Sequence, residues 1–275
     1  LTRWKMPQSW MMTIPIRSEK RIQTTPTIFM RGLDLDPVPR ICSKKLLNLI
    51  LDKADVKKWI IAREKGRNGL DHWQIRLTSS DPEFFEHMSE WCEWAHVEKA
   101  QTEDFTYERK EGRYWTSEDT TEIHKCRFGR LREDQKQILQ DLLLQTDRSI
   151  DVFYDPIGNR GKSWLSVHLF ETGQGLIVPR YSCTPEKLSA FICSAYRGEP
   201  YIIIDIPRAS KPSTALYETM EEIKDGLVFD PRYSGRTRDI RGVKLAVFTN
   251  HKLKLENLSA DRWNLHGWDR DGTLS

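Results

Sequence analysis

A glutamate, a histidine and a glutamine stand at spacings that could hold a metal ion. His72 and Gln74 are two residues apart in the alternating stretch LDHWQIRL, and Glu64 lies eight residues before His72, across the segment GRNG. If the two stretches pair as a hairpin, side chains at the paired ends meet on one face. A carboxylate oxygen, an imidazole nitrogen and an amide oxygen suit Mg²⁺ or Mn²⁺ rather than zinc. The plainer interpretation of His72 is a structural or exposed histidine.

A tyrosine and a lysine follow in the stretch YERK. Tyr107 and Lys110 are three residues apart, so on a helix they share a face. A tyrosine beside a metal that polarises a phosphate can attack phosphorus and become a covalent phosphotyrosine. Lys110 could steady the developing charge or position a metal-bound water. Alternatively, Tyr107 packs in the core and Lys110 lies on solvated surface.

The stretch DPIGNRGKSW has the composition of a phosphate-binding loop between a strand and a helix. Gly158 and Gly161 let backbone N–H groups turn inward at the helix start, Lys162 can reach the outer phosphates, and Ser163 can ligate magnesium. The strict pattern has glycine where this chain has Pro156, and the alternative is a surface turn. The expected ATP contacts in the loop are Gly158, Asn159, Arg160, Gly161, Lys162 and Ser163.

Two polar residues end apolar strands further along. Asp205 closes YIIID, where a carboxylate on the magnesium side belongs, and Asn250 closes LAVFTN, where it could contact the terminal phosphate and the attacking water. By itself, Asp205 could equally be a turn residue. Together with the glycine loop, and in this order, these residues predict binding of ATP with Mg²⁺.

The elements that must position these residues fall into two classes. Up to residue 116 the pattern predicts an antiparallel sheet with helices on one side, and from residue 131 strands and helices alternate, which predicts a parallel sheet with crossover helices. In the first part the expected strands are 9–16, 26–33, 57–65 and 71–79. The expected helices there are 43–54, 80–100 and a short helix that begins at 104 and stops near Gly112, and an amphipathic helix is expected over 131–145.

Composition narrows the class of protein. Residues 1–80 carry 16 Lys and Arg against 7 Asp and Glu, whereas residues 81–116 carry 4 against 10. The basic first third could attract a polyanion, or is a solvated basic face. With no run of 18 apolar residues and no apolar segment in residues 1–21, neither a membrane span nor a signal peptide is expected. Five cysteines without C-x-x-C spacing favour free thiols in a reducing compartment.

Taken in order, the motifs resemble those of the replication initiator (Rep) proteins of circular single-stranded DNA viruses of the smacovirus, nanovirus and circovirus type. WMMTIPI is similar to the first motif strand, HWQ to the metal motif with glutamine in place of its second histidine, and YERK to the Y-x-x-K nucleophile motif. GNRGKS, IIIDIPR and VFTN are similar to the Walker A, B and C motifs. FDPRYSGRTRDIRG resembles the B′ segment, and LSADRW a recurring C-terminal motif.

The resemblance implies a fold and an activity. It implies an α+β, ferredoxin-like HUH endonuclease over 1–116, a linker and oligomerisation helix over 117–148, and an α/β, AAA+-like superfamily 3 helicase ATPase over 149–275. The first domain would bind a stem-loop origin and nick its single-stranded loop with Mg²⁺ or Mn²⁺, joining Tyr107 to the 5′ phosphate. The second would hydrolyse ATP as a homo-hexameric ring that moves along single-stranded DNA.

The resemblance also implies further residues and partners. Arg236, Arg238 and Arg241 would face DNA in the helicase pore. Arg262, in LSADRW, is expected to be an arginine finger on the neighbouring subunit's ATP, or else a solvated residue of a helix-capping loop. Host replication machinery would be a partner, with the nucleus as the location in a eukaryotic host. The single Walker B acid, Asp205, leaves open which group activates the hydrolytic water.

Two other functions stay open on the sequence. One is an NTPase acting on RNA or DNA whose first domain only binds nucleic acid; it predicts a buried Tyr107 and no convergence of Glu64, His72 and Gln74. The other is a non-enzymatic binding module with a decayed phosphate loop, which an ATPase assay would separate.

Overall fold

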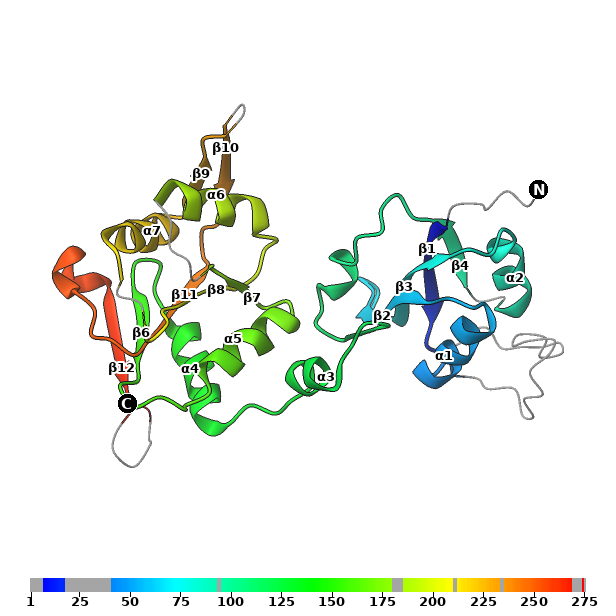
Figure 1. The fold of residues 1–275 in the computed structure, drawn as a ribbon, viewed down its shortest axis with the longest axis horizontal. Coiled ribbons are helices and arrows are strands. Elements are labelled where there is room, and N and C mark those ends of the chain that lie inside the picture. Colours follow the sequence, from blue (N-terminus) through cyan, green and yellow to red (C-terminus); the bar gives the residue numbers. More distant parts are fainter. Residues whose placement is uncertain are drawn as a thin grey trace. The chain divides into compact units, whose positions relative to one another are not determined.

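The computed structural model describes residues 7–17, 41–92, 95–179, 185–209, 212–232, 235–268 and 274. The candidate strand at 26–33 lies outside the described residues. The chain divides into two compact units, Leu1–His124 and Lys125–Ser275 (Figure 1). The division falls a few residues beyond 116, where the first domain was expected to end.

The first unit contains one five-stranded antiparallel sheet in the order β4-β1-β3-β2-β5. Its strands are β1 (Gln8–Pro15), β2 (Lys58–Lys65), β3 (Asp71–Ser79), β4 (His96–Lys99) and β5 (Tyr114–Thr116). The expected strands at 9–16, 57–65 and 71–79 are confirmed as β1, β2 and β3, and the GRNG turn joins β2 to β3 as a hairpin.

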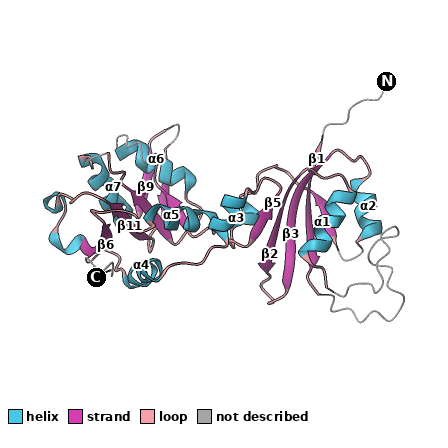
Figure 2. Ribbon diagram, turned by 60° about the horizontal axis from the view of Figure 1, so that its bottom comes forward, coloured by secondary structure: helices cyan, strands magenta, loops and turns pink. Residues whose placement is uncertain are grey.

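One face of this sheet carries the hydrophobic core. Alternate residues of β1 and β3, among them Met12, Ile14 and Ile75, pack against α1 (Lys44–Lys53) and α2 (Phe84–Trp91). Figure 2 shows both helices on one side of the sheet. The helix expected over 43–54 is confirmed, and the Ser43 hydroxyl caps it by accepting a hydrogen bond from the Leu46 N–H at 3.2 Å.

The helix expected over 80–100 is wrong in its second half. α2 ends at Trp91, and β4 follows as an edge strand that pairs with β1. Phe84 and Met88 have helical spacing and lie in the core, as the pattern predicts. The strand forms because β1 offers a free edge to His96–Lys99, and that partner lies far back in the sequence, outside any local pattern.

The short helix expected from residue 104 to near Gly112 is wrong, because only a single 3-10 turn forms, η1 (Tyr107–Arg109). The expected stop is confirmed, since Gly112 reverses the chain with a φ of +68°. The chain then enters β5, where the buried Tyr114 pairs with Ala62 of β2. The helix expected over 131–145 is confirmed as α4 (Glu133–Leu144), whereas α3 (Thr121–Arg127), in the stretch expected as a linker, was not predicted.

The second unit contains a five-stranded parallel sheet in the order β12-β6-β11-β8-β7. Its strands are β6 (Ile150–Tyr154), β7 (Gly175–Ile177), β8 (Tyr201–Asp205), β11 (Lys244–Thr249) and β12 (Trp263–Gly267). All five residues of β8 are buried, as expected for a central parallel strand. The parallel sheet with crossover helices is confirmed, whereas the edge strand β12 was not anticipated.

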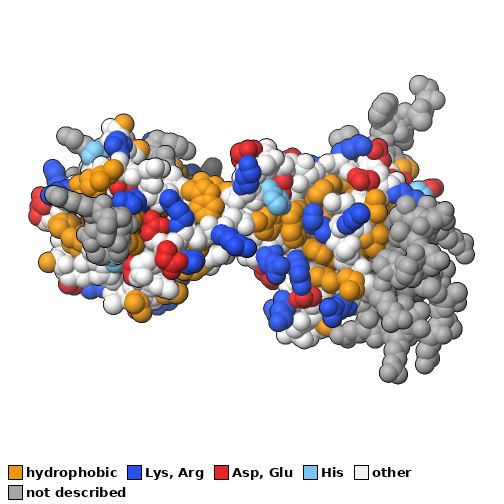
Figure 3. Space-filling view, turned by 90° about the horizontal axis from the view of Figure 1, so that it is seen from below, with side chains coloured by type: hydrophobic (Ala, Val, Ile, Leu, Met, Phe, Trp, Pro, Cys, Tyr) orange, Lys and Arg blue, Asp and Glu red, His pale blue; other side chains and the backbone are white. Residues whose placement is uncertain are grey.

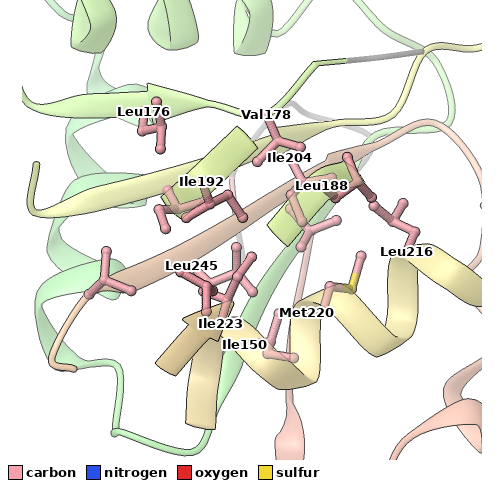
Figure 4. Close-up of a cluster of buried hydrophobic side chains, with 14 of the residues drawn as sticks. Ile150, Leu176, Val178, Leu188, Ile192, Ile204, Leu216, Met220, Ile223 and Leu245 are labelled. Atoms are coloured by element: carbon pink, nitrogen blue, oxygen red, sulfur yellow. The ribbon is translucent and has the colours of Figure 1, made fainter. Parts of the chain in front are cut away.

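Helices cover both faces of the parallel sheet (Figure 1). On one face Ile202, Ile204 and Val247 pack with α6 (Pro185–Ala195) and α7 (Thr214–Asp225), in the cluster drawn in Figure 4. On the other, Ile203 and Phe248 pack with α4 and α5 (Lys162–Glu171). α4 is therefore part of this unit's core through its buried residues, and its expected role in self-assembly stays a prediction.

A two-stranded hairpin, β9 (Leu227–Asp230) and β10 (Arg236–Asp239), extends from this unit beyond α6 (Figure 1). The sequence pattern did not predict it, because RTRD has no apolar alternation. Within the part of the chain that the structure describes, no helix combines the length and the hydropathy needed to cross a bilayer.

Candidate active sites

The β2–β3 hairpin brings the three predicted metal ligands onto one face of the sheet, opposite the face that packs on α1 and α2. Glu64 stands directly across from His72, and Ala62 across from Gln74. The His72 Nε2 atom lies 3.9 Å from Glu64 Oε2. Gln74 Oε1 accepts a hydrogen bond from the Thr13 hydroxyl at 2.8 Å, so it keeps one lone pair for another partner.

Glu64 is the feature of this face that best fits a cation. Its side chain is almost fully buried, and its Oε1 atom has no hydrogen-bond partner among the described residues. A buried carboxylate oxygen left unpaired is unfavourable, and a divalent cation would satisfy it. No cluster of three or more His, Cys, Asp or Glu side chains that could hold a metal occurs within the described ranges, so the amide of Gln74 would have to be the third ligand.

Tyr107 and Lys110 lie beside this carboxylate. The Lys110 ammonium donates to Glu64 Oε2 at 2.8 Å and stands 3.5 Å from the centroid of the Tyr107 ring. Tyr107 itself is 56% exposed, so it is not a core residue. Burial of Lys110 acts to lower its pKa, but hydrogen bonds to Glu64 and Tyr107 outweigh burial and raise the pKa above its ordinary value. The tyrosine, the lysine, the carboxylate and the histidine therefore converge.

Two charged residues of this region were missed by reasoning on the sequence. Arg76 continues the alternate series of His72 and Gln74 along β3, and its guanidinium donates to the buried Glu108 carboxylate of η1 at 2.8 Å. The alternation could have placed Arg76 on the metal face. Nothing in YERK marks Glu108 as buried, because its partner is 32 residues away in the sequence.

The phosphate-loop segment connects β6 to α5, as predicted. Gly158 and Gly161 have φ values of +94° and +73°, and Asn159 also adopts a positive φ of 67°. These left-handed residues curl the backbone at the start of α5, whose N-terminus favours an anion. Pro156, which stands where the strict pattern has glycine, is not among the positive-φ residues, so the backbone there does not demand glycine.

The side chains predicted to contact ATP gather at the carboxyl ends of β6, β8 and β11. The Ser163 hydroxyl donates to Asp205 Oδ2 at 3.3 Å, and the Asn250 amide donates to the carbonyl of Asp155. Because the ends of parallel strands meet at one edge of a sheet, residues nearly 100 apart in sequence come together. Arg160 and Asn159 lie in the curl of the loop itself.

Asp155 is a site residue that the sequence did not single out. Its carboxylate accepts from the Gly158 N–H at 2.6 Å and from the ammonium of the buried Lys162. Burial acts to raise the pKa of Asp155, but these hydrogen bonds outweigh it and the pKa lies below 3.8. The carboxylate therefore holds Lys162 within the loop.

Further polar side chains lie against the curl. Arg208, in the loop after β8, donates to the Ile157 carbonyl at 2.8 Å, and Gln135 of α4 donates to the Gly161 carbonyl at 3.1 Å. A methyl group on Gly161 would clash with the Arg132 guanidinium. Two arginines thus adjoin the place where phosphates would bind, and neither was predicted.

The three arginines expected to face DNA lie in or beside the β9–β10 hairpin. Arg236 is exposed, Arg238 donates to the Tyr196 carbonyl at 3.0 Å, and Arg241 is ion-paired with Asp239. Elsewhere, Lys and Arg side chains form small groups among hydrophobic and acidic ones on the face shown in Figure 3. Of the three, Arg236 is the one whose side chain is most available to a phosphate backbone.

Arg262 is placed differently from the expectation. It lies in η3 (Ala260–Arg262) and is only 4% exposed. Its guanidinium pairs with two acids of α7 in the same chain, Glu221 at 3.1 Å and Asp225 at 3.0 Å. In this structure Arg262 joins the C-terminal segment to α7, and its expected role as an arginine finger stays a prediction.

Comparison with known proteins gives relatives but no family model that matches. Over 118 residues the chain is 32% identical to the Master replication protein of Banana bunchy top virus, covering 43% of this chain and 39% of that protein. Over 133 residues it is 29% identical to Para-Rep C10 of Milk vetch dwarf C10 alphasatellite, covering 45% of each. This chain is similar to viral Rep proteins. The similarity spans less than half the length of either relative.

Among solved structures, glutamyl-tRNA reductase from Methanopyrus kandleri aligns with 89% of this chain and 72% of its own, at 8% identity and a TM-score of 0.22. A TM-score this low does not indicate a shared fold.

Proposed function

We propose that this chain initiates rolling-circle replication of a circular single-stranded DNA genome. In this proposal the first unit is a ferredoxin-like HUH endonuclease that nicks and rejoins origin DNA, and the second is an AAA+-like superfamily 3 helicase ATPase. The observation that carries the proposal is the convergence of Glu64, His72, Tyr107 and Lys110 beside one sheet face. The similarity to viral Rep proteins supports it.

Nicking would proceed by attack of the Tyr107 phenol oxygen on a phosphorus of the single-stranded loop. The bond from phosphorus to the 3′ oxygen breaks, the phenol proton leaves, and the released 3′ oxygen takes up a proton. Lys110, between Tyr107 and Glu64, would hold the phenol and steady charge on the phosphate. Joining is the reverse step, in which a 3′ hydroxyl attacks the phosphotyrosine and regenerates Tyr107.

Glu64, His72 and Gln74 would hold Mg²⁺ or Mn²⁺, with the unpaired Glu64 Oε1 as the charged ligand. The bound ion would polarise the scissile phosphate. The NTPase whose first domain only binds nucleic acid is less favoured, because it predicts a buried Tyr107 and separated ligands.

In the second unit, Lys162 and the loop N–H groups would bind the phosphates of ATP. Ser163 and Asp205 would bind the Mg²⁺ ion of ATP, and Asn250 would contact the terminal phosphate. Assembly as a homo-hexamer on single-stranded DNA, a stem-loop origin as substrate and cooperation with host replication machinery, in the nucleus of a eukaryotic host, complete the proposal.

The test is capture of the covalent intermediate. The protein is incubated with Mn²⁺ and a pool of labelled stem-loops with randomised loops, and a denaturing gel should show a protein–DNA adduct whose DNA can be sequenced. Tyr107→Phe removes only the attacking oxygen and should abolish the adduct. Tyr114→Phe, at the neighbouring buried tyrosine, is the matched control and should retain it. An adduct that persists in Tyr107→Phe would reject the nucleophile.

A further inference from the structure

Two ion pairs of opposite polarity join the YERK segment to the sheet. In one pair the carboxylate of Glu64 on the sheet binds Lys110, and in the other the guanidinium of Arg76 on the sheet binds Glu108. Both pairs have an N–O distance of 2.8 Å; Glu108 is the middle residue of η1, and Lys110 directly follows it. Tyr107, which begins η1, keeps its side chain exposed.

The Arg76–Glu108 pair is the more deeply buried of the two. The Glu108 side chain is fully buried and that of Arg76 is 11% exposed. Arg76 is also bound on its other side, because it donates to the Thr102 carbonyl at 2.9 Å. The Arg76 guanidinium thus joins β3 to two points of the segment before β5, Thr102 and Glu108, on either side of Tyr107 in the sequence.

The two ion pairs differ in whether one member is also a proposed metal ligand. Glu64 contacts Lys110 through Oε2 and would bind the proposed metal ion through Oε1, so one carboxylate has both roles. Within the described chain, the polar partners of Glu108 and Arg76 do not include Glu64, His72 or Gln74. Their contact can persist whatever Glu64 binds.

We propose that Arg76 and Glu108 are positioning residues that hold η1, and with it the Tyr107 phenol, at a fixed distance from the metal face. This inference rests on the proposed nicking function. A purely structural buried ion pair can be replaced by uncharged groups without loss of chemistry. A positioning pair cannot, because a shift of about 1 Å in a reacting group costs about 10²-fold in rate.

The experiment compares Glu108→Gln, Arg76→Met and the double variant with the unsubstituted chain. Single-turnover adduct formation is measured at saturating DNA and Mn²⁺, together with Tm and the affinities for DNA and Mn²⁺. Each single variant leaves a buried charge unpaired, so Tm should fall, and the double variant should recover much of it. The adduct rate should fall about 10- to 100-fold in all three variants and not recover in the double, with both affinities within about 2-fold of the parent.

The exposed pair Arg63–Asp71, at 2.7 Å on the same hairpin, gives the matched control. Asp71→Asn should leave the adduct rate unchanged. A double variant that is folded and forms adduct at the parental rate would overturn the inference.

Hydrogen exchange gives a readout that does not depend on nicking. Amides of residues 104–112 should exchange at least 10-fold faster in the double variant than in Asp71→Asn, because the segment has lost its contact with β3. Unchanged exchange would overturn the inference even if the parent formed no adduct. Failure of the parent to form an adduct would instead count against the proposed function.

Discussion

At the scale of single residues, the proposed chemistry depends on buried charged groups, because burial strengthens their interactions and makes an unpaired charge costly. Glu64 is the only formal negative charge among the proposed metal ligands, and one of its oxygens is buried without a partner in the described structure. Lys162 and Asp155 form a comparable buried pair in the second unit. Removal of Lys110 would leave Glu64, and removal of Lys162 would leave Asp155, as a buried carboxylate whose surroundings disfavour its charge.

The metal ligands should differ in their effect on affinity. Glu64→Gln, His72→Ala and Gln74→Ala should each weaken Mn²⁺ binding, and Glu64→Gln should weaken it most because it removes the charge. Titration calorimetry with Mn²⁺ measures the three affinities. An unchanged affinity in His72→Ala would show that this histidine is structural.

The pair of Asp155 and Lys162 predicts a pH dependence of stability. The folded-state pKa of Asp155 is lowered below 3.8, so its contribution to stability is present above that pH and is lost as pH falls through the folded pKa. Lys162→Met removes this contribution. Denaturant unfolding should therefore show a stability gap between the parent and Lys162→Met that is full at pH 7 and shrinks at pH 3 and below. A gap of equal size at both pH values would contradict it.

At the scale of elements, the curl before α5 depends on Gly158 and Gly161, whose positive φ angles would strain a residue with a side chain. Gly161 has a φ of +73° and faces the Arg132 guanidinium, whereas Gly198, with a φ of +102°, faces open space. The two glycines share the backbone demand and differ in the space around them. Alanine substitutions at the two positions therefore distinguish the effect of backbone strain from the effect of crowding by Arg132 at the phosphate loop.

Gly161→Ala should destabilise the second unit more than Gly198→Ala. Both carry the backbone strain of a left-handed alanine, about 1–2 kcal/mol, and Gly161→Ala adds displacement of Arg132. It should also weaken binding of a fluorescent ATP analogue, while Gly198→Ala should bind it like the parent. Thermal unfolding and fluorescence titration measure the two effects. Equal losses in both variants would mean that crowding by Arg132 has no part.

At the scale of the whole molecule, each unit has a core of its own, one between the antiparallel sheet and α1 and α2, the other on both faces of the parallel sheet. The proposed nuclease and ATPase sites lie wholly within different units. Lys162→Ala should therefore abolish ATP hydrolysis and leave adduct formation on single-stranded DNA largely unaffected. A parallel fall in nicking would show that the two units are coupled.

The placement of Arg262 leads to a prediction about assembly. Arg262→Ala removes the buried guanidinium, but the acids that it pairs with, Glu221 and Asp225, are 47% and 61% exposed, so water solvates them once the pair is lost. Tm should fall only modestly, through lost packing around the buried side chain. Arg262→Ala should keep its ATPase activity without any partner variant, whereas an arginine finger would make it inactive alone and partly active when mixed with Lys162→Ala. Recovery on mixing would restore the arginine-finger interpretation.

The sequence by itself determined the features that depend on neighbours along the chain. The alternation on both sides of GRNG places Glu64 opposite His72, because a short turn between two strands sets their register. The strand, glycine curl and helix around Lys162 are likewise one continuous segment. The order of these motifs also anticipated the similarity to viral Rep proteins.

The tertiary structure decided whatever depends on a distant partner. His96–Lys99 is a strand because β1 has an edge for it, and Tyr107 begins a short 3-10 turn because β5 forms soon afterwards. Glu108 is buried because Arg76 lies beneath it, and Arg262 is paired because α7 offers two acids. Local periodicity records which face of an element is apolar, whereas these contacts arise only when packing brings separate segments together, and no window of the sequence contains both partners.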